Sequence, residues 1–518
     1  MFRSSFLSIT TLAIASSSFA APLFIDRTGD ISHAYVGGWE HFVGGGVAAF
    51  DCDSDQFAEL FVAGGAEPAK LLANVTTESG ANLAFADATP DNLKIKSVTG
   101  AYPIDIDGDS ITDLVILRVG QNVIMRGLGG CKFEEFSKLQ FSSGEQWTTA
   151  FSATWEGNNA LPTLAFGNYV DRSAPDGPFE ACDANSLYRP VDGAYAEPAK
   201  LEPGYCALSL LFSDWGRTSK ADLRVSNDRH YYVKAGHEQL WNMRTTPALY
   251  TRDQGWIEHK IWGMGIASRD ISGDGLPEIY LTSMGDQKLQ SIQGSGATPT
   301  YTDATFGKGI TTHRPYKGDD GRPSTGWHVA FGDIQNDGLD DLFVAKGNVD
   351  QMISSAMADP NSLLIQNQDG TFEEYGDKAQ VGSEARSRGA ALLDLNLNGL
   401  LDLVVVNRRA NLEIYQNIST DTGNWASIQL TQDRQNANAI GAWIEVKADS
   451  KTYARELTIG GGHASGMLAP EHFGLGKTET FEVRITWPNG TKSDWTTLQV
   501  NKFWTLKRVG DQVKADAY

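Results

Sequence analysis

The chain has 518 residues, in which 64 aspartates and glutamates outnumber 43 lysines and arginines and give a formal net charge of −21. An acidic surplus of this size, with no basic stripe along the sequence, argues against nucleic acid and anionic membranes as partners. The 54 glycines and many aromatic residues favour a turn-rich, all-β chain, and the length allows one large ring and a small second domain.

Residues 1–20 have the pattern of a secretory signal peptide. Arg3 precedes an apolar stretch from Phe6 to Ala15, and small residues lead to Ala20 and Ala21. The apolar stretch is too short to cross a bilayer, and no later stretch is long enough, so we expect no transmembrane segment. The sequence therefore predicts a protein that is secreted, periplasmic or held at the cell surface.

A nine-residue acidic pattern recurs five times from residue 51 onward. Its first, third, fifth and ninth positions carry oxygen side chains, which converge in a tight turn and suit a hard cation that takes six or more oxygen ligands. We expect Ca2+, with up to about five ions bound. The predicted ligands are Asp51, Asp53, Asp55 and Glu59; Asp105, Asp107, Asp109 and Asp113; Asp270, Ser272, Asp274 and Glu278; Asp333, Gln335, Asp337 and Asp341; and Asp394, Asn396, Asn398 and Asp402.

An EF-hand is the first alternative for these turns. It needs a bidentate glutamate at the twelfth position and a helix on each side. The twelfth position is apolar in every copy, as Val62, Ile116, Leu281, Val344 and Val405. Each turn instead runs into a short stretch of β-branched, aliphatic or aromatic residues, which predicts a buried strand.

The spacing of the turns predicts seven repeats. Two degraded copies fill the gap between residues 105 and 270: Asp214 to Asp222 keeps the outer carboxylates, whereas Trp155 to Thr163 keeps only the length and the following strand. Strand-like stretches that begin with an aromatic residue precede most turns. About four strands per repeat predict a seven-bladed β-propeller over residues 21–417, with both ends of the region in one blade.

The four cysteines fit an oxidising compartment, where disulfides persist. Three pairings are possible. Sequence order favours Cys182 with Cys206 and Cys52 with Cys131, and four buried free thiols are the alternative.

Residues 418–518 differ from the repeats. Alternating apolar and polar residues predict antiparallel strands in a small β-domain that docks on the ring. Its motifs resemble, in order and spacing, the ASPIC/UnbV domain, while the acidic repeats resemble FG-GAP/VCBS repeats of the integrin-α type. These motifs are Ala439-Ile-Gly-Ala442, Gly460-Gly-Gly-His-Ala-Ser-Gly466, His472-Phe-Gly-Leu-Gly476 and Ile485-Thr-Trp-Pro-Asn-Gly490 in the domain, and Phe331-Gly-Asp-Ile-Gln-Asn-Asp-Gly338 among the repeats.

Together these features resemble the cartilage acidic protein family, in its bacterial branch. The resemblance covers nearly all of the chain after residue 20 and implies a seven-bladed, calcium-binding propeller outside the cytoplasm. It implies no established reaction.

Three classes of function stay open from the sequence. The first is a binding or adhesion module for an extracellular protein or a glycan, with the binding site in loops at one end of the ring. The second is an enzyme that acts on polysaccharide through acidic residues near the ring axis. The third is a structural calcium protein. The scan gives neither a serine nucleophile elbow nor a zinc-protease motif, so no catalytic residue and no organic cofactor is predicted, and the oligomeric state is left open.

Overall fold

The computed structural model describes residues 21–174, 181–228, 235–243, 246–318, 320–433 and 435–518. The predicted signal peptide lies outside these residues. Every regular element in the described parts is a strand or a 3-10 helix, and this confirms the all-β prediction. The 3-10 helices are η1 (Trp39–His41), η2 (Asp91–Leu93), η3 (Ser137–Leu139) and η5 (Arg252–Gln254).

Up to Asn417, the described strands form seven groups of four antiparallel strands, and the second and third groups are joined into one larger sheet by the pairing of Gln146 with Gly120. The first three are β2 (Val47–Phe50), β3 (Glu59–Val62), β4 (Lys70–Asn74) and β5 (Phe85–Asp87); β6 (Val98–Ile104), β7 (Asp113–Gly120), β8 (Val123–Gly127) and β9 (Phe133–Glu135); and β10 (Gln146–Thr154), β11 (Thr163–Asn168), β12 (Asn185–Tyr188) and β15 (Ala199–Leu201). A small hairpin of β13 (Pro190–Val191) and β14 (Ala194–Tyr195) projects from the third sheet.

The next three sheets continue the same order along the chain. They are β16 (Ala207–Ser213), β17 (Asp222–Asn227), β18 (Gln239–Asn242) and β19 (Ala248–Leu249); β20 (Gly263–Arg269), β21 (Glu278–Ser283), β22 (Lys288–Ile292) and β23 (Tyr301–Asp303); and β24 (Gly326–Gly332), β25 (Asp341–Lys346), β26 (Ser362–Gln366) and β27 (Phe372–Glu374). The last sheet is β28 (Arg386–Leu393), β29 (Asp402–Arg408), β30 (Glu413–Asn417) and β1 (Phe24–Asp26).

The first strand of each sheet contacts the first strand of the next. Contacts run from β2 to β6, β10, β16, β20, β24 and β28, and β28 also contacts β2. In the last sheet, Phe24 of β1 lies opposite Asn417 of β30. The prediction that both ends of the repeat region lie in one sheet is therefore confirmed.

Each acidic turn joins the first strand of its sheet to the second. The ninth residue of the pattern begins that second strand, as Glu59 begins β3 and Asp113 begins β7. The two degraded turns occupy the equivalent places, between β16 and β17 and between β10 and β11. The turn-to-strand reading of the pattern is confirmed, since no helix flanks these turns in the described residues.

The C-terminal part contains two further four-stranded sheets. One consists of β35 (Glu471–Gly476), β31 (Asn424–Thr431), β38 (Lys502–Val509) and β39 (Gln512–Ala517), and the other of β33 (Lys451–Glu456), β32 (Trp443–Ala448), β36 (Thr480–Thr486) and β37 (Thr496–Gln499). Ile428 and Phe473 of the first sheet share one buried cluster with Ile444 and Val483 of the second. Burial of both apolar faces in a common core holds the two sheets together.

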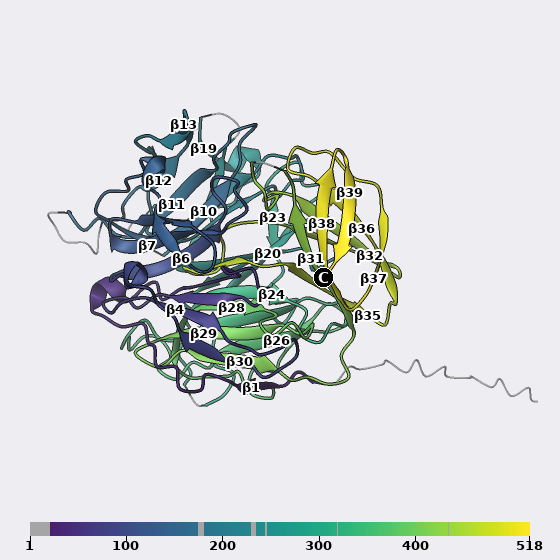
Figure 1. Ribbon diagram of the computed structural model, residues 1–518. Coiled ribbons are helices and arrows are strands. Elements are labelled where there is room, and N and C mark those ends of the chain that lie inside the picture. Colours follow the sequence, from purple (N-terminus) through teal and green to yellow (C-terminus); the bar gives the residue numbers. More distant parts are fainter. Residues whose placement is uncertain (1–20, 175–180, 229–234, 244–245, 319, 434) are drawn as a thin grey trace, which may run out of the picture.

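A segment of the C-terminal part, residues 459–468, enters the middle of the seven sheets (Figure 1). It includes β34 (Gly466–Leu468), which pairs in parallel with β2. Ser465, Ile459, Gly460 and Gly462 form single bridges with Ala101, Ala153, Leu211 and Ile266, one in each of β6, β10, β16 and β20. His463 donates its backbone N–H to Nδ1 of His328 in β24, and Gly389 of β28 lies beside Ser465. The segment thus touches the first strand of every one of these sheets.

Two disulfides fix loops of the first four sheets. Cys52 pairs with Cys131 and Cys182 pairs with Cys206, with Cα atoms 4.7 and 4.8 Å apart. The first bridge ties the turn after β2 to the loop before β9, and the second ties the loop before β12 to the start of β16. Both predicted pairings are confirmed, and the alternative of free thiols is wrong.

Candidate functional site

The first aspartate of each acidic turn accepts hydrogen bonds from the backbone of its own turn. One carboxylate oxygen accepts the N–H of the fourth or fifth residue, and the other accepts the N–H of the sixth. In the second turn the two distances are 2.9 and 3.0 Å, from Gly108 and Ser110 to Asp105. The same arrangement occurs at Asp51, Asp270, Asp333 and Asp394. These bonds fold the turn and aim its side chains inward.

The ninth residue closes the turn with a second carboxylate. It accepts the N–H of the second residue in all five copies, at 2.9 or 3.0 Å. In three copies its other oxygen accepts an N–H from the end of the third strand, because Gly127 donates to Asp113, Gln366 to Asp341 and Asn417 to Asp402. A single carboxylate therefore joins the turn to the rest of its sheet.

The predicted ligands gather most closely in the first two turns. Asp51, Asp53 and Glu59 have carboxylate oxygens within 4.8 Å of one another. Asp105, Asp107 and Asp113 form the equivalent group in the second turn. In the fourth and fifth turns the third residue is an amide that donates a hydrogen bond. Gln335 Nε2 donates to the carboxylate of Asp337, and Asn396 Nδ2 donates to the backbone carbonyl of Ala81.

The third position of the pattern carries oxygens without partners. Asp107 Oδ1, Gln335 Oε1 and Asn396 Oδ1 are buried and have no hydrogen-bond partner among the described residues. A buried acceptor left unpaired costs about 1–3 kcal/mol. Three such oxygens at the same place in three turns fit a group that supplies positive charge at that place, as a hard cation does.

Burial raises the pKa of many of these carboxyl groups. The pKa of Glu59 and of Asp113 rises to about 8 because the groups are desolvated and other carboxylates lie beside them. Burial raises the pKa of Asp105 to about 6 and that of Asp270 to about 7. The pKa of Asp333, Asp341 and Asp402 is also raised, first by burial and then by neighbouring acids. Ionised carboxylates in this setting need a cation close by.

An arginine lies on the second turn. Arg126 of β8 forms ion pairs with Asp107, at 3.1 Å, and with Asp109, at 2.7 Å. All three side chains are about a quarter exposed. The guanidinium thus neutralises two predicted ligands, and sequence reasoning missed it because Arg126 lies in another strand, 17 residues from Asp109.

The fourth sheet holds its degraded turn with side-chain donors instead. Asp222 stands at the place of the ninth residue, and one oxygen accepts the N–H of Met243, as Asp113 accepts that of Gly127. The other oxygen accepts hydrogen bonds from Trp215 Nε1 and Tyr250 OH. These donors supply the partial positive charge beside the Asp222 carboxylate that a cation would supply in an acidic turn.

The C-terminal part lies against several of these turns. His472 Nε2 forms a hydrogen bond with Asn336 in the turn after β24, at 2.7 Å. Arg455 forms an ion pair with Asp340 of the same turn at 2.9 Å, and Glu456 accepts the N–H of Asp214 in the fourth sheet. The conformation of these turns and the position of the C-terminal part are therefore coupled.

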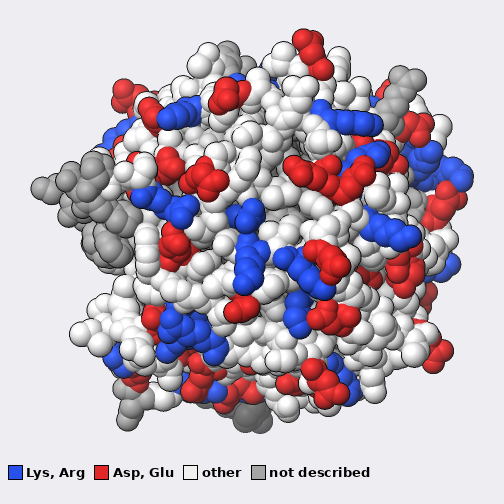
Figure 2. Space-filling model, turned by 60° about the vertical axis from the view of Figure 1, so that its left-hand side comes forward, with Lys and Arg blue, Asp and Glu red and all other residues white. Residues whose placement is uncertain are grey.

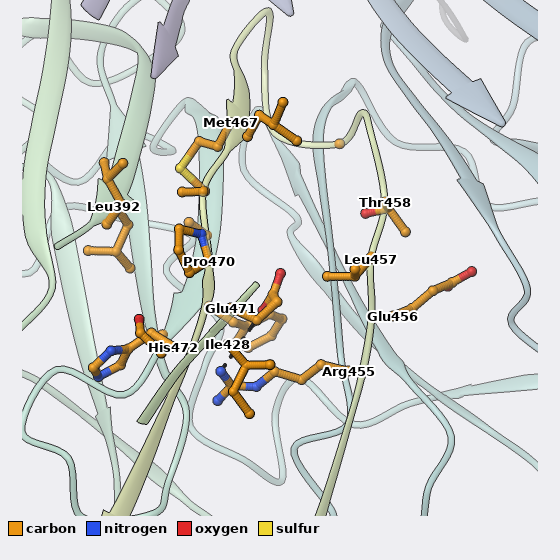
Figure 3. A pocket seen from close by; sticks show the side chains of 18 of the residues that line it. Leu392, Ile428, Arg455, Glu456, Leu457, Thr458, Met467, Pro470, Glu471 and His472 are labelled. Carbon is orange, nitrogen blue, oxygen red and sulfur yellow. Dashed lines mark ion pairs between the residues drawn. The ribbon is translucent and has the colours of Figure 1, made fainter. Parts of the chain in front are cut away.

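A cavity of about 530 Å³ lies between the seven sheets and the C-terminal part. Apolar side chains such as Leu392 line much of its wall, and Arg455 and Glu471 lie together inside it (Figure 3). Glu471 also pairs with Arg269, at 3.3 Å, and Asp340 pairs with Arg455. Asp51, Asp270, Asp394 and Glu456 also line the cavity, so its acidic side chains outnumber its two arginines.

In the described residues, no helix is long and apolar enough to span a membrane. Comparison with solved structures gives low similarity. A complex of BBS1N with ARL6DN aligns with a TM-score of 0.43 at 10% identity, over 77% of this chain and 99% of that chain. An Agrocybe aegerita protein that recognises non-reducing terminal N-acetylglucosamine aligns with a TM-score of 0.31 at 13% identity, over 73% and 81%.

Sequence comparisons give partial similarity to known proteins. Residues 432–513 match the ASPIC and UnbV family. Cartilage acidic protein 1 of Mus musculus is 26% identical over 233 residues, which are 44% of this chain and 34% of the relative. The Homo sapiens protein is 25% identical over 233 residues, 44% and 33% of the two chains. The match thus spans about a third of the length of these curated relatives. Part of the chain is therefore similar to cartilage acidic protein 1, and residues 432–513 are similar to the ASPIC and UnbV family.

Proposed function

We propose that this protein is a secreted or periplasmic, calcium-binding, seven-bladed β-propeller that acts as a protein- or glycan-binding module. The order of contacts from β2 through β28 and back to β2 supports a closed ring. The two disulfides and the leader-like start of the sequence support a place outside the cytoplasm. The ring spans residues 21–417 and the ASPIC and UnbV domain follows it.

One observation carries the calcium proposal. The same two-carboxylate turn recurs in five sheets, and buried oxygens at its third position have no partner in three of them. Calcium prefers oxygen ligands and flexible geometry, and bound there it supplies the positive charge that the carboxylates lack. The four predicted ligands of each turn hold the ions, and the first two turns hold them with most carboxylates.

Bound calcium has a structural role in this proposal. It stiffens the turns at one end of the ring, where the C-terminal part docks, and the long loops at the other end are left to bind a partner. The polysaccharide-active alternative needs two carboxylates that face each other across an axial pocket. Residues 459–466 occupy that axis instead, and this favours the binding module.

Thermal unfolding tests the calcium step. The chain is melted after EGTA treatment, then with added Ca2+, and with Mg2+ as the control. A cation that binds only the folded chain adds about 2.7 kcal/mol per site at a hundredfold excess over Kd, so the midpoint rises with Ca2+. An unchanged midpoint contradicts the proposal. A glycan array and binding to candidate extracellular proteins, each with and without EGTA, test the binding role.

A further inference from the structure

Four arginines gather at the end of the ring opposite to the acidic turns. In the last sheet, β28 and β29 are joined at one end by the acidic turn 394–402. Arg386 starts β28 and Arg388 follows, while Arg408 ends β29 and Arg409 comes next. These four residues, with Asp350 of the loop after β25, are called the arginine cluster.

The arginine cluster has an excess of positive charge. Asp350 lies 2.9 Å from Arg409 and 3.6 Å from both Arg386 and Arg408. Four guanidinium groups and one carboxylate leave three positive charges, in a chain whose net charge is −21. Charges farther than about 8 Å are largely screened at physiological salt, so a ligand in this cluster meets the local positive charge and little of the distant negative charge.

The two inner arginines build the cluster and the two outer ones face solvent. Arg388 is buried and donates to backbone carbonyls of Phe42, Ser387 and Val349. Arg408 is also buried and donates to the carbonyl of His41. The side chains of Arg409 and Arg386 are 43% and 27% exposed. A guanidinium presents donors in a planar fork that matches a carboxylate, so the outer pair can receive one from solution.

An exposed tryptophan stands next to the cluster. Gly37 accepts hydrogen bonds from both Arg408 and Arg409, at 3.2 Å each. Trp39 follows two residues later in η1 and is 38% exposed. Its ring is held edge-on against Trp147, with centroids 5.2 Å apart. A supported aromatic ring beside exposed arginines offers an apolar face and an anion site within one loop.

Figure 2 looks onto the side of the molecule that lies at the left of Figure 1, where the purple η1 turn lies. Basic and acidic side chains are mixed across this face of the molecule. The C-terminal sheets lie on another side in Figure 1. The 43% exposure of Arg409 and the 38% exposure of Trp39 leave part of both side chains accessible to a ligand.

We propose that the arginine cluster and Trp39 bind a uronate-containing polysaccharide, with a sugar carboxylate on Arg386 and Arg409 and the ring of a neighbouring sugar against Trp39. The inference rests on the proposed binding function and names its ligand class. A sugar has both the carboxylate for the guanidinium fork and a flat carbon face for the indole. An acidic peptide uses the arginines but has no need of Trp39, so the two classes respond differently to loss of this ring.

The test measures Kd for a fluorescent hyaluronan hexasaccharide and the purified full chain. Chitohexaose is the neutral probe, and hexaglutamate is the acidic peptide probe. The intact protein is expected to bind hyaluronan at least about tenfold more tightly than chitohexaose, because a charge-assisted fork contributes more than about 1.4 kcal/mol. Equal affinity for these two sugars overturns the proposal, and so does hexaglutamate binding as tight as that of hyaluronan.

Variants locate the site. The double variant R386A/R409A is expected to lose at least about tenfold in affinity for hyaluronan, while D350N gains affinity because it removes the competing carboxylate. W39A weakens hyaluronan binding and leaves hexaglutamate binding unchanged. The control is R189A, since Arg189 pairs with Glu156 and is 33% exposed but lies outside the cluster.

The conservative double variant R386K/R409K is less prone to a folding defect, because lysine keeps the positive charge. It lacks the planar guanidinium that binds a carboxylate through two hydrogen bonds. Thermal midpoints equal to that of the parent show that each variant is folded. Hyaluronan binding that survives R386A/R409A in a folded chain overturns this site. In that case the protein still binds a ligand, so the proposed binding function stands. If no probe on the array and no candidate protein binds, both the arginine-cluster site and the proposed binding function are contradicted.

Discussion

Trp215 donates its indole N–H to the carboxylate of Asp222, at 3.1 Å, in the turn where other sheets place an acidic ligand set. Tyr250 and Met243 complete the donors to the same carboxylate. The fourth sheet therefore holds its turn without a cation, and it serves as an internal control for the acidic turns.

The first prediction compares Asp222 with Asp113. Asp113→Asn removes a calcium ligand, so it reduces the rise in thermal midpoint that Ca2+ gives. Asp222→Asn breaks hydrogen bonds to a buried carboxylate and costs about 1–3 kcal/mol with or without Ca2+. Unfolding of both variants in EGTA and in Ca2+ checks this. An equal calcium response in the parent and in D113N would falsify the assignment of the second turn.

Arg126 is predicted to compete with calcium at the second turn. Arg126→Met removes the guanidinium from Asp107 and Asp109, so these carboxylates bind Ca2+ more tightly. Because the pairs are about a quarter exposed and screened by solvent, we expect a Kd roughly threefold to tenfold lower. Calorimetric titration with Ca2+ measures this, with R189A as the control. Weaker calcium binding in R126M contradicts the prediction.

The packing of residues 459–468 against the first strands predicts that a side chain at Gly46 destabilises the protein. A Cβ atom at Gly46 would lie 1.8 Å from the carbonyl oxygen of Ala464. Gly46→Ala therefore displaces the segment and costs about 3 kcal/mol or more. Gly321→Ala is the control, because nothing lies within 4 Å of its added Cβ. Chemical denaturation measures both changes, and equal stability of the two variants means that the segment does not pack in the axis as described.

Two buried histidines in contact, His328 and His463, make the stability depend on pH. Burial lowers the pKa of His328 to about 4 and, with help from Arg388, that of His463 to about 3. Below pH 6.5 the unfolded chain binds protons that the folded chain does not, so the free energy of unfolding falls by about 1.4 kcal/mol per pH unit for each histidine. This stability is present above pH 6.5 and is lost as the pH falls toward 4.

His463→Gln isolates this effect from the many carboxyl groups with raised pKa, which both proteins share. The stability of the parent relative to H463Q is expected to fall by about 1.4 kcal/mol for each unit from pH 6.5 to pH 4.5. Urea denaturation across this range measures the difference. A difference that does not change with pH contradicts the burial of a neutral His463.

Local patterns in the sequence were enough to predict the turns and their strands. The turn at Asp105 to Asp113 depends on residues within nine positions, and the strand after it follows from an apolar run. The sharing of one sheet by both ends of the repeat region follows from a first strand that stands before the first turn, and the structure shows it where Phe24 lies opposite Asn417. Both are consequences of periodicity along the chain.

Contacts between distant parts could not be predicted in the same way. The motif Gly460 to Gly466 is visible in the sequence, but its place among the sheets depends on glycines of other sheets that leave room for it, such as Gly46 and Gly100. Likewise, Arg409 and Asp350 lie 59 positions apart and come together only when neighbouring sheets pack. Such contacts carry no local signal in one sequence.

Anomalous diffraction from crystals of the full chain grown with Ca2+ tests the central claim most directly. We predict calcium peaks between the carboxylates of the acidic turns, first of all at Asp51 to Glu59 and at Asp105 to Asp113. No peak is expected at Asp214 to Asp222, where Trp215 and Tyr250 hold the carboxylate. Crystals that diffract well and show no ion in any of the five turns would contradict the proposal.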